Sequence, residues 1–199
     1  MTNSIINAPL VIIGFGSQAK AWALNLRDSG HKVIIALRAS SPSEEAVSAL
    51  GFESFLLEDS SFPKAAAVLL LIPDHLHDSF LQKNSALIET GTKIIYAHGY
   101  SISKSKLHKT YPNFSHLLLA PKAIASEVRF QFEVKGKLGA LYSNEYALNK
   151  EADKEFIFAL ASSIGITGGP YVASFEEETR ADLFSEQALL CGLIPYAAL

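Results

Sequence analysis

An apolar strand, a glycine-rich turn and a helix follow one another near the start of the chain. Residues 10–14 are predicted to form the strand and residues 17–29 the helix, which Gly30 would terminate. The turn between them, GFGSQA, matches the pattern G-x-G-x-x-G/A. A second apolar strand is expected at residues 32–37, so the stretch predicts a βαβ unit with a right-handed crossover.

The small residues of this turn favour dinucleotide binding. Gly14 would make the tight turn, and Gly16 would let the backbone approach a pyrophosphate. The small Ala19 would let helix and strand pack closely, and the amides at the helix N-terminus would face the phosphates. Glycines also end strands for purely structural reasons. We favour dinucleotide binding because this glycine turn follows an apolar strand and begins a helix.

The end of the second strand favours NADP over NAD. An acid at this place would hydrogen-bond the ribose 2′-hydroxyl and repel a 2′-phosphate. This chain has Arg38 followed by Ser40, Ser41 and Ser43, and a cation with several hydroxyls suits a phosphate dianion. The alternative is that Arg38 is a solvated surface residue and the serines are turn and cap residues.

Apolar runs and helical patterns alternate along the rest of the chain. Strands are expected at 67–72, 93–97, 116–120, 140–143 and 171–173, and helices at 42–50, 75–87 and 150–164. This rhythm predicts an α/β fold with a Rossmann-like, doubly wound, mostly parallel sheet that binds ligands at the carboxyl ends of its strands. Ser174 and Glu177 fit a capping box for a final helix, whose acidic first turn suits the helix dipole.

Composition and charge exclude several other classes of protein. The chain has 199 residues, 49% of them apolar and 19% charged, which is typical of a globular protein. A net charge of −3 gives no reason to expect nucleic acid or a membrane as a partner. The longest apolar run, residues 65–73, is too short to span a bilayer. The N-terminus lacks signal-peptide features and Cys191 is the only cysteine, so we expect a cytoplasmic location.

Several stretches, in order along the chain, resemble one family. They are GFGSQAKAWALNLRDSGHKVIIALR, LLIPDHLHDSF, YAHGYSI, LLLAPK and FEEETRADLFSEQALLCG, which together are similar to ketol-acid reductoisomerase, also called acetohydroxyacid isomeroreductase. The resemblance implies an NADP(H)- and Mg²⁺-dependent oxidoreductase of branched-chain amino-acid biosynthesis, for isoleucine and valine. Its partner would be a small 2-hydroxy-2-keto acid of the 2-acetolactate type, isomerised by alkyl migration and then reduced by NADPH.

The resemblance also implies roles for matching positions. His98 and Lys122 match the family's active-site histidine and lysine, and Asp182 and Glu186 match its metal-binding carboxylates, so these four are the expected catalytic residues. The implied cofactor-binding positions are Phe15, Ser17 and Gln18 beside the two turn glycines, then Arg38, Ser41 and Ser43, and finally Asp74, His75, Leu76 and His77.

Each of these sites has a plain structural alternative. Asp182 and Glu186 lie four residues apart on one helix face, and such pairs are usually a solvated acidic surface. His98 could be a hydrogen-bonded structural group, and Lys122 an exposed loop residue. His75 and His77 resemble a metal pair, but their spacing does not place them on one helix face, so we favour contact with the cofactor.

The chain departs from the family's pattern at two places. After Lys122 the family usually has Gly-Pro-Gly, whereas this chain has Ala123-Ile124-Ala125, and alanine resists the positive φ values that glycine accepts. Either this loop is rebuilt or the nicotinamide lies differently. Ser185 also stands where the family usually has glycine.

Residues 1–173 are expected to form an NADP-binding Rossmann domain, and residues 174–199 the first helix of a truncated, all-helical C-terminal domain. Large apolar residues on that helix favour a two-fold homodimer through it. Without the family's remaining metal ligands, the 199-residue chain is expected to bind NADPH without turnover. Two alternatives stay open, namely a non-catalytic NADP-binding or sensor module and another NADP-dependent reductase of small acids or imines.

Overall fold

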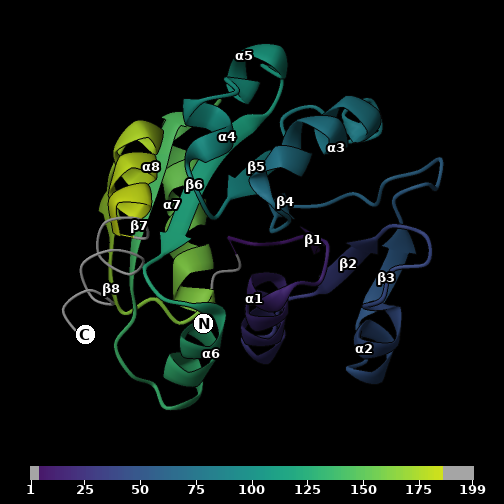
Figure 1. Ribbon diagram of the computed structural model, residues 1–199, viewed down its shortest axis with the longest axis horizontal. Coiled ribbons are helices and arrows are strands. Elements are labelled where there is room, and N and C mark those ends of the chain that lie inside the picture. Colours follow the sequence, from purple (N-terminus) through teal and green to yellow (C-terminus); the bar gives the residue numbers. More distant parts are fainter. Residues whose placement is uncertain (1–4, 186–199) are drawn as a thin grey trace, which may run out of the picture.

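Eight strands form one sheet with the order β3-β2-β1-β4-β5-β6-β7-β8 in the computed structural model, which describes residues 5–185 (Figure 1). The strands are β1 (Leu10–Ile13), β2 (Val33–Leu37), β3 (Glu53–Leu56), β4 (Ala67–Leu70), β5 (Lys93–Tyr96), β6 (Ser115–Pro121), β7 (Gly139–Tyr146) and β8 (Gly168–Val172). All neighbours are parallel except β6 and β7, which are antiparallel. The predicted Rossmann-like, mostly parallel sheet is therefore confirmed.

Helices cover both faces of this sheet. One face carries α1 (Ser17–Asp28), α2 (Glu44–Ala49), α6 (Ala125–Glu133) and α7 (Lys150–Ser163). The other carries α3 (His77–Asn84), α4 (Tyr100–Ser103), α5 (Leu107–Thr110) and α8 (Phe175–Phe184), with the 3₁₀ turn η1 (Asp74–Leu76) before α3. Successive strand residues point to opposite faces. Leu10 and Ile12 thus join one core cluster, and Val11 and Ile13 join the other.

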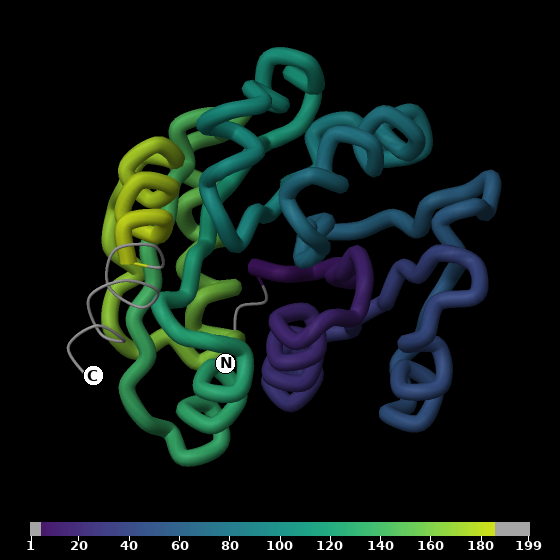
Figure 2. The backbone as a smooth tube through the Cα atoms, in the orientation of Figure 1, coloured from purple at the N-terminus to yellow at the C-terminus, as the bar shows by residue number. Residues whose placement is uncertain are grey.

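The order of the strands reverses beside β1. This strand pairs in parallel with β2 on one side and with β4 on the other. Figure 2 shows the purple chain starting in the centre, running outward to β3, and then returning through the teal and green segments toward β8. The carboxyl ends of β1, β2, β4 and β5 therefore lie along one edge, around the point where ligands bind in such sheets.

Some elements differ from the sequence expectation. The strand β3 and the helices α4, α5 and α6 were not predicted, because β3 lies at the sheet edge with mostly exposed residues and α6 buries only Val128. The helix expected at 75–87 begins as η1, and α3 ends at Asn84. The capping box is confirmed, since Ser174 and Glu177 exchange hydrogen bonds at the start of α8. None of the helices within residues 5–185 combines the length and the apolar character needed to cross a bilayer.

A buried histidine on β6, His116, is bonded to a tyrosine on β5. The hydroxyl of Tyr96 lies 2.9 Å from Nδ1 of His116, and the Tyr111 carbonyl lies 2.8 Å from Nε2. Because a carbonyl only accepts, Nε2 carries the proton and Nδ1 accepts from Tyr96. Burial lowers the pKa of His116 to about 4, so the ring is neutral at pH 7.

Acidification should destabilise the fold through this ring. His116 takes a proton near pH 6.5 in the unfolded chain but only near pH 4 in the folded one, so stability is lost as the pH falls through that window. Between pH 7 and pH 5 we expect its contribution to drop by about 2 kcal/mol. Urea unfolding of the parent and of His116→Gln at both pH values would measure this. Equal losses in the two proteins would contradict the prediction.

Candidate functional site

The predicted glycine turn lies at the end of β1, beside β4. Gly14 has φ +80°, and an added Cβ would lie 2.6 Å from Cγ2 of Ile72, so both conformation and space require glycine. Gly16 is the N-cap of α1, and a Cβ there would meet nothing within 4 Å. Among the residues that the structure describes, no side chain caps this helix end. The first amides of α1 are therefore available to an anion.

A cleft of about 680 Å³ opens beside this turn. It brings together six of the predicted cofactor residues, which are Gly14, Gly16, Arg38, Ser41, Ser43 and Leu76. Residues that the sequence did not indicate complete the lining, among them Leu57 and Glu58 after β3 and Phe80 on α3. The first two were missed because β3 itself was not predicted.

Three other predicted residues of the turn face away from this cleft. Phe15 is buried against Phe52, with ring centroids 5.8 Å apart. Nε2 of Gln18 donates to the Ala123 carbonyl at 3.3 Å, and Ser17 lines a different groove between α1 and α6. None of these three side chains lines the cleft.

In the segment after β4, too, some of the predicted cofactor residues point away from the cleft. Asp74 turns toward His98, and His75 is exposed. His77 is buried, with Nε2 3.0 Å from the Ile72 carbonyl and Nδ1 2.7 Å from Oγ of Ser101. Burial lowers the pKa of His77, which keeps the ring neutral. Both ring nitrogens of His77 are therefore bonded within the protein. Of residues 74–77, Leu76 is the one that lines the cleft.

A cluster of charged side chains forms where β5, β6 and α8 meet. Nζ of Lys122, at the end of β6, lies 2.6 Å from Oε1 of Glu178 and 3.2 Å from Oδ1 of Asp182. Nε2 of His98 lies 3.3 Å from Oδ2 of Asp182 without hydrogen-bond geometry. Three of the four expected catalytic residues thus converge, and the fourth, Glu186, lies outside the described residues.

Glu178 is the member of this cluster that sequence reasoning missed. Its residue is only 1% exposed, and its Oε2 accepts a 2.6 Å hydrogen bond from the amide of Gly99. From the sequence it belongs to the acidic first turn of α8, which the helix dipole explains without any site. Its spacing of four residues from Asp182 was the available signal, since that spacing places both carboxylates on one helix face.

His98 is held between carboxylates on both sides of its ring. Nδ1 lies 3.1 Å from Oδ2 of Asp74, opposite the α8 carboxylates. Burial alone would lower the pKa of His98, but the hydrogen bond with Asp74 and the charges of Glu178 and Asp182 outweigh it, so the pKa is raised. The ring is therefore suited to hold a proton beside the cluster.

The cluster offers some of the ligand atoms that a bound cation would need. One ligand atom from each of His98, Glu178 and Asp182 lies within 4.8 Å of the others. Both oxygens of Glu178 are already bound, by Gly99 and Lys122. The side chain of Asp182 is 32% exposed and can offer oxygen to Mg²⁺, which prefers such ligands to imidazole. Of these two α8 carboxylates, Asp182 is therefore the available ligand.

Both departures from the family's pattern are accommodated without strain. Ile124 has φ −67° and ψ 159° and is the N-cap of α6, so the segment after Lys122 leads directly into a helix. Within residues 5–185, the non-glycine residues with positive φ are Ser40, Lys106 and Lys135, so residues 123–125 need no glycine. Ser185 keeps helical angles at the end of α8 and bonds the Ala181 carbonyl at 2.9 Å.

The turn, the cleft and the reversal of strand order define a dinucleotide-binding domain of the Rossmann type. A family model described as "Acetohydroxy acid isomeroreductase, NADPH-binding domain" matches residues 4–169, and the chain belongs to this family. The resemblance to ketol-acid reductoisomerase seen in the sequence is confirmed.

Two relatives show how much of the family's length the chain covers. A curated ketol-acid reductoisomerase (NADP(+)) of Xylella fastidiosa (strain 9a5c) is 33% identical over 196 residues, 96% of this chain and 55% of that protein. An NADH-preferring ketol-acid reductoisomerase from an uncultured archean has a TM-score of 0.82 and 26% identity, covering 94% of this chain and 58% of that one. The chain therefore spans about half the length of these relatives.

A more distant structure shares the fold alone. A semialdehyde dehydrogenase NAD-binding protein from Cupriavidus necator has a TM-score of 0.74 at 13% identity, covering 97% of this chain and 72% of that one.

The homodimer expected through residues 174–199 stays a prediction, because most of the apolar residues on which it rests lie outside the described residues.

Proposed function

We propose that the chain is the cofactor-binding part of a ketol-acid reductoisomerase that isomerises and reduces a 2-acetolactate-type acid in branched-chain amino-acid biosynthesis. The observation that carries this proposal is the charged cluster of His98, Lys122, Glu178 and Asp182. It lies at the carboxyl ends of β5 and β6, on the sheet edge that also carries the glycine turn. Family membership alone would support the cofactor but not these side chains.

The cleft residues are suited to NADPH. The free amides of α1 would bind the pyrophosphate, and Arg38, Ser41 and Ser43 would bind the 2′-phosphate. Bound NADPH supplies the hydride for the reduction. We keep residues 1–173 as the proposed NADP-binding domain, with α8 opening the next one.

The cluster would bind substrate and hold protons. The Lys122 ammonium can donate to a carboxylate or hydroxyl oxygen, and Glu178 positions it from the buried side. His98 would hold or accept a proton, oriented by Asp74. Asp182 and Glu186 are the proposed ligands of Mg²⁺, which would polarise substrate oxygens.

The reaction can be tested directly. NADPH oxidation would be followed with 2-acetolactate, with and without Mg²⁺, in the longest natural form of the protein. Turnover that requires Mg²⁺ would support the proposal. Reduction of another small acid or of an imine without Mg²⁺ would replace it with a different reductase.

Replacing Arg38 with aspartate should reverse the cofactor preference. Charge-assisted hydrogen bonds contribute about 1.5–3 kcal/mol each, so NADPH should lose at least about tenfold in affinity. NADH, which has no 2′-phosphate, should be spared. Fluorescence titration of both cofactors would measure this, with Arg180→Asp as the control because Arg180 is an exposed residue of α8 paired with Glu176. Equal affinities of the parent for NADPH and NADH would contradict the predicted phosphate site.

A further inference from the structure

An acidic side chain lies at the same end of the cleft as Arg38. Oε2 of Glu58 accepts a 3.0 Å hydrogen bond from the backbone amide of Ala39. The amide of Leu57 donates to the Leu37 carbonyl at 2.7 Å, which fixes the end of β3 beside the end of β2. Glu58 therefore reaches the turn after β2 from a neighbouring strand, although no acid directly follows β2 in the sequence.

The turn that Glu58 contacts is tight. Ser40 has φ +56°, the Ser41 amide bonds the Arg38 carbonyl at 3.2 Å, and the Ser43 amide bonds Oγ of Ser41 at 3.3 Å. The Ala39 amide is a further donor of this turn, and Glu58 occupies it. The cleft is lined by Arg38, Ser41, Ser43 and Glu58 together, so donors and one carboxylate share this end.

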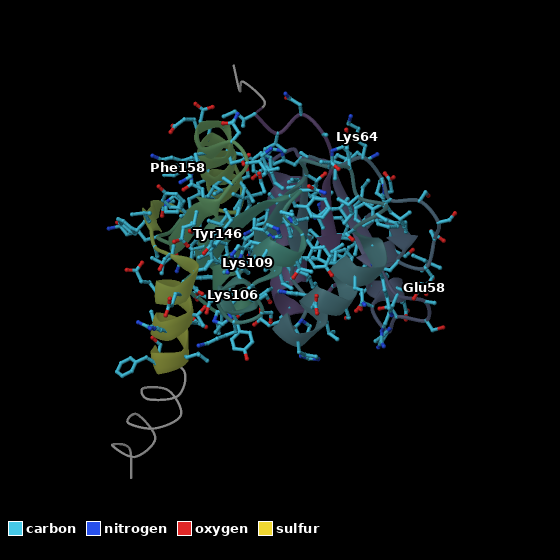
Figure 3. All side chains as sticks on the ribbon, turned by 90° about the horizontal axis from the view of Figure 1, so that it is seen from above. Glu58, Lys64, Lys106, Lys109, Tyr146 and Phe158 are labelled. Atoms are coloured by element: carbon cyan, nitrogen blue, oxygen red, sulfur yellow. The ribbon has the colours of Figure 1, made fainter. Side chains whose placement is uncertain are left out.

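Glu58 and Arg38 act in opposite directions on the same ribose substituent. A 2′-phosphate gains from the guanidinium but is repelled by the carboxylate, which also holds an amide that could bind phosphate. A 2′-hydroxyl can instead donate to the carboxylate. Figure 3 shows Glu58 on the flank of the molecule away from α8, so it lies apart from the charged cluster.

We infer that Glu58 is a specificity-determining residue that weakens the preference of this site for NADPH over NADH. The inference rests on the proposed function, because it takes the cleft to be the cofactor site. The relative affinity for NADPH and NADH would then depend on two opposite charges, Arg38 after β2 and Glu58 after β3.

Glu58→Gln tests this with two nucleotides that carry only the adenosine end. The glutamine side chain would keep an acceptor for the Ala39 amide but lose the charge. Calorimetric binding of adenosine 2′,5′-bisphosphate should tighten about tenfold, because repulsion of a phosphate dianion by a carboxylate through water costs roughly that factor. Binding of 5′-AMP should change less than about threefold, since its 2′-hydroxyl can bond either side chain. The gain should shrink at high salt.

Glu53→Gln is the matched control, because Glu53 starts the same strand and pairs with exposed Lys32 at 2.8 Å. Unchanged or weaker bisphosphate binding in Glu58→Gln would overturn the inference, as would an equal gain in Glu53→Gln. The proposed cofactor site would survive that negative result if the parent binds the bisphosphate and Arg38→Asp does not. A parent that binds neither nucleotide overturns the cofactor site and this inference with it.

Discussion

Replacing Lys122 with methionine is expected to lower the free energy of unfolding by about 3 kcal/mol, the low end of the usual cost of breaking a buried ion pair, because the Lys122 side chain is 35% exposed. Glu178 is 1% exposed and would keep its charge without the ammonium that lies 2.6 Å from it. The Gly99 amide would remain as its hydrogen-bond partner, and His98, with Nε2 3.8 Å from Oε2 of Glu178, would offset the charge only in part. Urea unfolding at pH 7 would measure the loss.

Two variants separate this effect from loss of any surface charge. Lys64→Met removes the exposed pair with Glu89, at 3.3 Å, and should cost less than about 1 kcal/mol (Figure 3). Adding Glu178→Gln to Lys122→Met should recover most of the loss, because the unpaired charge is gone. An equal, small effect in Lys122→Met and Lys64→Met would show that Glu178 is well solvated and the pair unimportant.

Replacing Gly99 with alanine is expected to cost about 3–4 kcal/mol, because overpacking and a strained hydrogen bond to a charged group add together. Gly99 has φ −79°, so alanine is acceptable to its backbone. The new Cβ, however, would collide with the Phe175 carbonyl oxygen and lie 2.6 Å from Oγ1 of Thr179. The start of α8 would have to move away and pull Glu178 from the Gly99 amide.

Gly139→Ala provides the control for this substitution. A Cβ at Gly139 would lie 3.6 Å from the Gly168 carbonyl oxygen, which is ordinary contact, so its cost should stay within about 1 kcal/mol. Thermal unfolding of both variants would give the comparison. If Gly99→Ala is as mild as Gly139→Ala, α8 is not held as closely to the turn after β5 as the structure indicates.

Local patterns predicted much of this fold because they depend on neighbouring residues. The turn at Gly14 and the capping box at Ser174 are each specified within a few positions. The strand β3 was missed because its residues are mostly exposed at an edge, which leaves no apolar pattern to read. The same cause hid Glu58, which reaches the cleft only because β3 pairs with β2.

The charged cluster was predicted only through a resemblance. His98, Lys122 and Asp182 are far apart in the chain, and no spacing rule joins a strand end to a distant helix. Glu178 had a local explanation in the dipole of α8, and that explanation concealed its burial beneath Lys122. Contacts of long sequence separation depend on sheet order and helix placement, which a single sequence does not report.

The attachment of α8 has a mechanical consequence for whatever follows it in the chain. Phe175 is part of the core beneath the sheet, and Glu178 is bonded to both Gly99 and Lys122. A hinge at Ser174 would have to expose that ring and leave the carboxylate unpaired, so we expect α8 to move together with the sheet that carries the cofactor cleft. Asp182 on α8 would therefore stay close to His98, whose Nε2 lies 3.3 Å from its Oδ2, when other parts of the protein move.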